Sequence, residues 1–151
     1  MTDRPADEIP IPALLRAARG TYAAAIAGQL ASAGIDDLPR HGAFVLGGMA
    51  GRGAMAADLI DGLGIGRQQA AQLVDTLVTR GYLTREESPG DRRRGTLALT
   101  DRGRLAAAEI RAAIEDIDDE LGRRLAPDQL IGLRAGLFAL AQIKREQRDA
   151  R

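Results

Sequence analysis

Hydrophobic residues recur at three- and four-residue intervals over most of the chain, which is the spacing of amphipathic α-helices. This spacing predicts four long helices, over residues 10–33, 38–49, 101–124 and from Pro127 through Ile143. Gly34 is placed to end the first helix and Pro127 to begin the last one. In the second helix Phe44, Val45 and Leu46 are expected to face the core. The chain is therefore expected to be mainly helical.

Two shorter helices joined by a glycine turn are predicted at the centre of the chain. The first covers residues 55–60, the turn is the Asp-Gly-Leu-Gly of residues 61–64, and the second covers residues 66–80. Leu73 and Leu77 are the inward-facing residues of the second helix. Two short helices held at a steep angle across a tight turn have the spacing of a helix-turn-helix.

A β-hairpin is predicted directly after the helix-turn-helix. Residues 82–87 alternate as a strand, a Ser-Pro-Gly-Asp turn follows, and residues 95–100 form the returning strand. The tip carries Arg92, Arg93 and Arg94 in succession. Three adjacent guanidinium groups repel one another unless a polyanion or an acidic neighbour compensates them. We expect one domain of mainly α structure with a small β-hairpin (α+β), in which the hairpin is the wing of a winged helix.

The composition excludes several classes of site. The chain has no cysteine, so it has no disulfide, thiolate metal site or cysteine nucleophile, and its one histidine, His41, excludes a multi-histidine metal site. Aromatic residues make up 3% of the chain, too few for the stacking surface of single-strand binders, so duplex is favoured if the protein binds nucleic acid. No apolar run is long enough for a membrane span and the first residues are acidic, so we expect a cytoplasmic protein. No catalytic residue, metal or other cofactor is expected.

The hairpin carries an Asp-Arg-Arg motif, followed by Leu-Thr and a trailing glycine, and the second helix of the helix-turn-helix ends with a leucine and a glycine. These residues are Asp91, Arg92, Arg93, Leu99, Thr100 and Gly103, with Leu77 and Gly81 before them. With this combination the chain resembles, over essentially its whole length, the MarR family of winged-helix transcriptional regulators.

The resemblance implies an architecture and a function. It implies a homodimer whose terminal helices, residues 10–34 and 105–147, interlock, and a winged helix-turn-helix over residues 38–104 that reads a pseudo-palindromic operator. A repressor is the expected mode of action. The resemblance also implies a pocket for a small-molecule effector between each winged domain and the helical arm, where Tyr22, His41 and Phe44 are the candidate contacts.

The candidate base contacts lie at the start of the second helix of the helix-turn-helix. Arg67 can donate two hydrogen bonds to guanine, and Gln68, Gln69 or Gln72 can pair with the edge of adenine in the major groove. Three- and four-residue spacing places the glutamines on one exposed face of the helix. Many members of the family have small hydroxyl residues here, so the operator sequence does not follow from that of its relatives.

The candidate contacts of the wing are its arginines. The resemblance implies that Asp91 pairs with Arg93 to order the loop, while Arg92 or Arg94 enters the minor groove. The formal net charge of the chain is zero, but it divides unevenly, as −1, +2 and −1 over residues 1–51, 52–104 and 105–151. Neutrality therefore does not exclude duplex binding.

Two other functions remain as alternatives. One is a dimeric winged-helix module that binds a protein and no operator, which would have little reason to keep three arginines at a wing tip. The other is an enzyme that uses His41 with Asp36 or Asp58. No nucleophile elbow, metal-ligand set or cofactor motif accompanies that histidine, so the enzyme is disfavoured.

Overall fold

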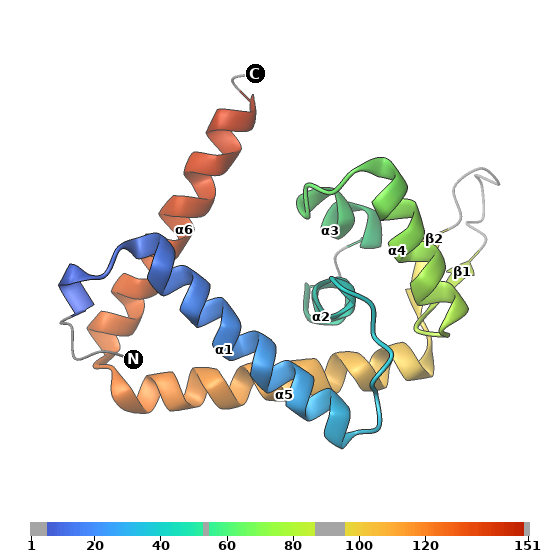
Figure 1. The fold of residues 1–151 in the computed structure, drawn as a ribbon, viewed down its shortest axis with the longest axis horizontal. Coiled ribbons are helices and arrows are strands. Elements are labelled where there is room, and N and C mark those ends of the chain that lie inside the picture. The colour runs from blue at the N-terminus through green and yellow to red at the C-terminus, as the bar shows by residue number, and fades with distance from the viewer. Residues whose placement is uncertain (1–5, 53–54, 87–95, 150–151) are drawn as a thin grey trace. The chain divides into compact units, whose positions relative to one another are not determined.

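The computed structural model describes residues 6–52, 55–86 and 96–149 of the 151-residue chain (Figure 1). It consists of two compact units, residues 1–114 and 115–151. After a short 3-10 helix (Ala6–Glu8), the elements are α1 (Ile11–Ser32), α2 (Gly42–Arg52), α3 (Ala56–Gly62), α4 (Arg67–Thr79), β1 (Leu83–Glu86), β2 (Thr96–Leu99), α5 (Asp101–Arg124) and α6 (Pro127–Asp149). The described elements are mainly helices, with one antiparallel pair of strands. This confirms the predicted fold class.

Helix α2 begins four residues later than predicted. Leu38 precedes Pro39, and the ring of a proline disfavours helical backbone in the residue before it. The carbonyl oxygen of Pro39 accepts a hydrogen bond from the N–H of Gly42 at 2.8 Å, which closes a turn. Within that turn His41 has a φ of 69°, in the left-handed region. The predicted start at residue 38 is therefore wrong, because a turn occupies residues 39–42.

The predicted end of the first helix is confirmed at Gly34. This glycine has a φ of 73°, and its N–H donates to the carbonyl oxygen of Ala31 at 3.0 Å. The N–H of Ile35 donates to the carbonyl oxygen of Leu30 at 2.8 Å, and both of these side chains are buried. The pair of hydrogen bonds and the apolar contact form a Schellman motif, which a glycine in the left-handed conformation makes possible.

The same motif ends α4 and sets the start of the hairpin. Gly81 has a φ of 74° and donates to the carbonyl oxygen of Val78 at 2.9 Å, and Tyr82 donates to that of Leu77 at 2.9 Å. The side chains of Leu77 and Tyr82 are completely buried. The hairpin then pairs Leu83 with Leu99 and continues in antiparallel register to the pair of residues 86 and 96. Both predicted strands are confirmed over residues 83–86 and 96–99.

The core of the first unit lies between the end of α1, helices α2 to α4, the hairpin and the first half of α5. Its buried apolar members include Leu30, Ile35, Val45, Leu46, Ile60, Leu73, Leu77, Tyr82, Leu83, Ala106 and Ile110. Val45 and Leu46 are buried as predicted, but Phe44 is 51% exposed, so the prediction that it faces the core is wrong. With 3.6 residues per turn, three consecutive residues of one helix do not share one narrow face.

The Leu-Thr and trailing glycine that support the family resemblance have a physical role at the start of α5. The hydroxyl oxygen of Thr100 accepts a hydrogen bond from the N–H of Gly103 at 3.0 Å and caps the helix. The same hydroxyl donates to the carbonyl oxygen of Gly81 at 2.5 Å. A Cβ atom at position 103 would lie 2.1 Å from the carbonyl oxygen of Tyr82. Only a glycine at this position lets α5 approach the end of α4 so closely.

The second unit consists of the end of α5 and helix α6. As predicted, α6 begins at Pro127, and the N–H of Ala126 donates to the side chain of Gln129 at 2.9 Å. Large apolar side chains of α6 are exposed in the single chain, at Ile131, Leu133, Leu137, Phe138, Leu140 and Ile143. At 3.6 residues per turn, Phe138 and Leu140 lie on opposite sides of the helix. Helices that are apolar on all sides are normally buried.

Candidate nucleic-acid interface

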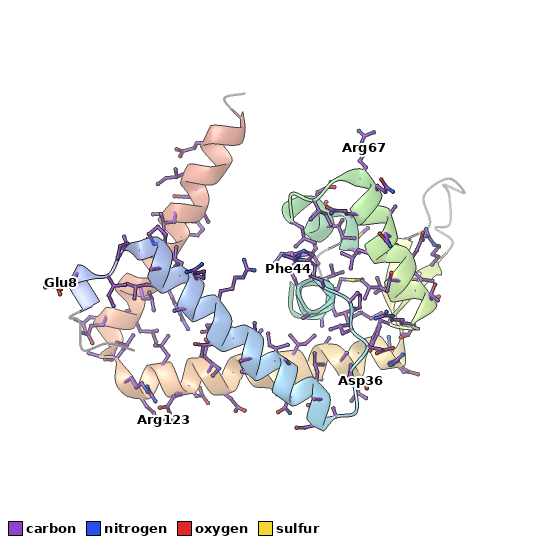
Figure 2. The ribbon with its side chains drawn as sticks, viewed as in Figure 1. Glu8, Asp36, Phe44, Arg67 and Arg123 are labelled. Atoms are coloured by element: carbon purple, nitrogen blue, oxygen red, sulfur yellow. The ribbon has the colours of Figure 1, made fainter. Side chains whose placement is uncertain are left out.

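Helix α4 buries one side and exposes the other, as the sequence predicts. Leu73 and Leu77 lie in the core. Arg67, Gln68, Gln69 and Gln72 are exposed. Figure 2 shows Arg67 extending outward from the start of the helix. The four predicted base-contact residues are thus all accessible, and they lie together at the N-terminal half of α4.

The two ends of α4 are held differently. At its start, Gly66 occupies the N-cap position and supplies no side-chain hydrogen bond to the first backbone N–H groups. At its end, the Schellman motif of Gly81 satisfies the last carbonyl groups. No acidic residue lies in the first turn. The N-terminal end of α4 therefore keeps the partial positive charge of its unpaired N–H groups, next to the guanidinium group of Arg67.

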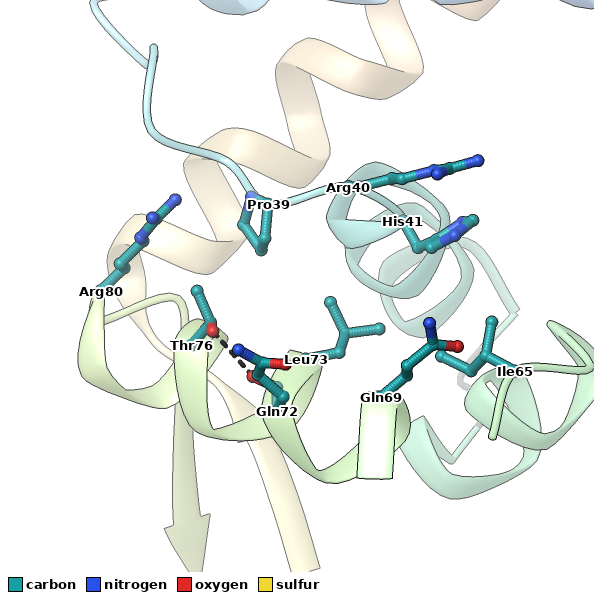
Figure 3. Close-up of a pocket in the computed structure, with 9 residues that line it drawn as sticks. All are labelled: Pro39, Arg40, His41, Ile65, Gln69, Gln72, Leu73, Thr76 and Arg80. Atoms are coloured by element: carbon teal, nitrogen blue, oxygen red, sulfur yellow. Dashed lines mark hydrogen bonds between the residues drawn. The ribbon is translucent and has the colours of Figure 1, made fainter. Parts of the chain in front are cut away.

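A groove runs along α4 on the side that faces the segment before α2 (Figure 3). Its volume is about 490 Å³. The residues that contribute polar side chains to it are Arg40, His41, Gln69, Gln72, Thr76 and Arg80. Two of the predicted base contacts, Gln69 and Gln72, therefore lie beside the cationic side chains of Arg40 and Arg80. No motif in the sequence indicates that these two arginines belong to the site.

A second hollow, of about 610 Å³, lies on another side of α4. Gln68, Gln72 and Asp75 contribute to its lining. Asp75 forms an ion pair with Arg85 of β1, with 2.9 Å between Nη2 and Oδ1, and both side chains are largely exposed. An exposed pair of this kind stabilises the fold only slightly, but it joins the hairpin to α4.

A cluster around Asp37 ties the segment before α2 to the end of α4 and the start of α5. The carboxylate of Asp37 accepts hydrogen bonds from the hydroxyl of Tyr82 and, at 2.8 Å, from Arg102. The backbone carbonyl of Asp37 accepts one from Arg80. The guanidinium of Arg102 lies 4.4 Å from the centre of the Tyr82 ring. No motif signals this cluster in the sequence, because its members come from three separate segments.

The cluster shifts the pKa values of two of its members. The hydrogen bond from Tyr82, followed by the charge of Arg102, lowers the pKa of Asp37. Burial, followed by the hydrogen bond to Asp37, raises the pKa of Tyr82 from 10.0 to about 12. The two shifts have one consequence: the neutral phenol and the charged carboxylate stabilise each other in the folded state.

Replacing Tyr82 with phenylalanine is expected to change how stability depends on alkaline pH. Between pH 10 and 12 the unfolded tyrosine loses its proton while the folded one retains it, so the unfolded state binds fewer protons. The free energy of unfolding of the wild-type protein therefore falls over this range, by roughly 2–3 kcal/mol in total. Tyr82→Phe removes this loss. Urea unfolding of both proteins at pH 9, 10 and 11 measures the difference.

An optical titration provides the control for this prediction. The chain has two tyrosines, so the variant retains only Tyr22. The absorbance of the wild type at 295 nm should show a step near pH 12 that the variant lacks. Parallel stability curves for the two proteins above pH 10 would contradict the assignment.

The remaining predicted site residues are those of the wing and those of the effector pocket. Asp91, Arg92, Arg93 and Arg94 lie outside the described residues. His41 lines the groove along α4, and neither of the two hollows on α4 is lined by Tyr22 or Phe44. Figure 2 shows Phe44 on the outer side of α2. Binding of a small molecule by Tyr22, His41 and Phe44 stays a prediction.

The described residues contain no group of three or more histidine and acidic side chains placed to hold a metal ion. No helix in the described part of the chain combines the length and the apolar character that crossing a membrane requires.

Comparison with known protein sequences identifies relatives of this region. Residues 36–94 match the model of the MarR family. The chain is also 34% identical over 99 residues to the LexA repressor of Deinococcus radiodurans, a match that covers 60% of this chain and 45% of that protein. The chain thus spans less than half the length of that curated relative.

Comparison with solved structures extends the likeness beyond the matched segment. A complex of MepR from S. aureus with DNA has a TM-score of 0.70 at 17% identity, and covers 89% of this chain and 98% of its own. The repressor CouR, bound to a 23-mer DNA duplex, has a TM-score of 0.66 at 28% identity, over 89% and 94% of the two chains. Apo MarR from E. coli has a TM-score of 0.60 at 20% identity, over 87% and 97%. Their fold is that of transcriptional regulators. Residues 36–94 thus match the MarR family, and the described part of the chain has the winged-helix fold of these regulators.

Proposed function

We propose that the protein is a sequence-specific regulator of transcription that binds double-stranded DNA as a homodimer and represses genes at a pseudo-palindromic operator. The observation that carries the proposal is the exposed group of Arg67, Gln68, Gln69 and Gln72 at the uncapped start of α4. These side chains present bidentate donors and acceptors, which is what reading of base edges in the major groove requires. The match of residues 36–94 to the MarR family supports the proposal, as do the similar structures of MepR and CouR, which are DNA complexes.

The proposed contacts divide into two kinds. Arg67 and the glutamines of α4 read bases, whereas the wing arginines, Arg92 to Arg94, approach the backbone and the minor groove. Asp91 holds the wing in order by pairing with Arg93. This division predicts different effects of substitution at the two places.

A homodimer is proposed from the apolar surface of the terminal helices. The large apolar side chains of α6 are exposed on opposite sides of that helix, and Ile11 and Leu14 of α1 are exposed as well. So many large apolar side chains exposed on a single chain indicate a protein interface. A symmetric dimer places two copies of α4 for two half-sites of an operator.

The remaining parts of the proposal concern regulation and location. A small molecule that binds near Tyr22, His41 and Phe44 releases the operator. The protein acts in the cytoplasm and is not an enzyme.

Substitutions in α4 and in the wing are expected to weaken DNA binding in different ways. Gln69→Ala or Arg67→Ala removes a base contact of roughly 1–3 kcal/mol, so it changes which duplexes are preferred. Arg93→Ala weakens binding to all duplexes alike. Fluorescence anisotropy with DNA from upstream of the gene and with duplexes changed at single positions measures both effects.

The salt dependence of the wild-type protein tests the proposal as a whole. Each phosphate that the protein neutralises contributes about 0.9 to the slope of log affinity against log salt, so affinity should fall steeply. If the α4 variants weakened every duplex equally, base reading by these residues would be wrong. A dimer that bound no duplex at all would favour a module for protein binding instead.

A further inference from the structure

A further DNA contact can be assigned to the groove along α4, which Arg40, His41 and Arg80 line. This assignment rests on the proposed function. We propose that Arg40 and His41, in the segment before α2, bind the phosphate backbone of the operator on the flank of α4 that faces away from the hairpin. The site would be a second backbone contact, separate from the wing. Its ligand is a phosphodiester of duplex DNA.

The charge of the groove suits an anion. Arg40, His41 and Arg80 line it, and no carboxylate does. Arg40 is exposed and makes no ion pair with any residue that the structure describes. Asp37, in the same segment, is already paired with Arg102. Among the described residues the guanidinium of Arg40 therefore has no acidic partner that a phosphate would have to displace.

The geometry of α4 in a major groove places this segment near a DNA strand. With its side chains an α-helix is about 10–12 Å across, and the major groove is about 12 Å wide, so the helix fills it. Elements on the two flanks of the helix then meet the two sugar-phosphate backbones. At roughly 100° per residue, Asp75, which contacts the hairpin, and Gln69, which lines the groove, lie about 120° apart around α4.

Gln72 is three residues from both Gln69 and Asp75 and lies between these two flanks, about 60° from each around α4. It therefore marks the side of α4 that we expect to point into the major groove. The hairpin faces one DNA strand from one flank, and Arg40 and His41 face the other strand from the opposite flank.

The contacts of the segment fix it in place before DNA binds. Asp37 joins it to Tyr82 and Arg102, and Arg80 donates to its backbone. Among the described residues other than glycine, His41 alone has a positive φ, at 69°. Unfavourable backbone of this kind is found at binding sites more often than elsewhere. In Figure 3 the imidazole lies across from Gln69 and Ile65, at the end of the groove away from Arg80.

The experiment measures binding of the full-length protein to two probes. One is a duplex that the wild-type protein selects from a random-sequence library, and the other is a scrambled duplex of equal length. Arg40→Gln is expected to weaken binding about tenfold on both duplexes and to lower the salt slope by about 1. The control is Arg40→Lys, which keeps a positive charge at the same position and should retain most of the wild-type affinity.

The variant His41→Gly distinguishes the contribution of the imidazole ring to binding from the contribution of the backbone turn to folding. Glycine adopts a φ of 69° without strain, so the variant should melt at the wild-type temperature or higher. It should nevertheless bind both duplexes a few-fold more weakly, since it lacks the imidazole. Loss of binding through a damaged fold would instead lower the melting temperature.

A scan with single methylphosphonates along the selected duplex locates the contact. At one backbone position outside the bases read by α4, the neutral linkage should weaken binding of the wild type but not that of Arg40→Gln. If Arg40→Gln kept the wild-type affinity and salt slope while the wild type bound its selected duplex, this assignment would be overturned and the proposed function would stand. A wild-type protein that bound neither duplex would overturn both.

Discussion

Gly103→Ala is expected to lose more than about 3 kcal/mol of folding stability, a large part of the 5–15 kcal/mol that holds a typical domain together. The added methyl group would lie 2.1 Å from the carbonyl oxygen of Tyr82, well inside van der Waals contact. The obstacle is a backbone atom, so no change of side-chain rotamer relieves it. Either α5 moves away from the end of α4, or the hydrogen bonds of Thr100 to this turn break.

Urea unfolding followed by circular dichroism measures this loss, and the same helix supplies the control. Apart from its chain neighbours and the adjoining helix backbone, no atom of the described residues lies within 4 Å of a Cβ atom built on Gly122, also in α5. Gly122→Ala should therefore raise stability by about 0.5–1 kcal/mol, the ordinary gain of alanine over glycine in a helix. Equal stabilities of the two variants would show that the close approach at position 103 is unimportant.

Phe138→Asp is expected to convert the proposed dimer to a monomer and to weaken operator binding at least about 100-fold. The ring of Phe138 is 64% exposed in the single chain, so a charge there costs the monomer little. In a dimer that buries this surface, the same carboxylate would be desolvated without a partner. A monomer also loses the gain in affinity, on the order of 10²- to 10⁴-fold, that comes from binding two half-sites at once.

Sedimentation velocity measures the association state, and anisotropy with a palindromic duplex measures the affinity. Phe138→Leu is the matched control, because it keeps an apolar side chain at the same place and should remain dimeric. A Phe138→Asp protein that stayed dimeric and bound the duplex normally would place the interface elsewhere.

Local patterns were sufficient to predict most of the fold. The periodicity of apolar residues located the helices, and Gly34 and Gly81 marked two of their ends because each adopts a backbone conformation that other residues disfavour. The start of α2 was mispredicted, since apolar spacing continues through residues 38–41 although Pro39 and the positive φ of His41 form a turn there. Phe44 was misplaced because a run of apolar residues does not say which of them faces the core.

The candidate site was predictable only where it lies within one helix. Spacing alone placed Arg67 and the glutamines on the exposed side of α4. The groove beside them is formed by side chains from two segments, Arg40 and His41 on one side and Thr76 and Arg80 on the other. The cluster that holds it depends on Asp37 meeting Tyr82 and Arg102, which are 45 and 65 residues away. Such contacts follow from tertiary packing, which periodicity does not encode.

The unequal ends of α4 have a thermodynamic consequence for recognition. The last turn is fixed by the Schellman motif, whereas the first turn lacks a side-chain cap, so the free energy of local opening rises from the start of the helix to its end. The proposed base-reading side chains stand on the turn that lacks this cap. For the proposed function we therefore expect binding of the correct base sequence to complete the folding of that turn, so that part of the discrimination between operators is conformational entropy rather than contact energy.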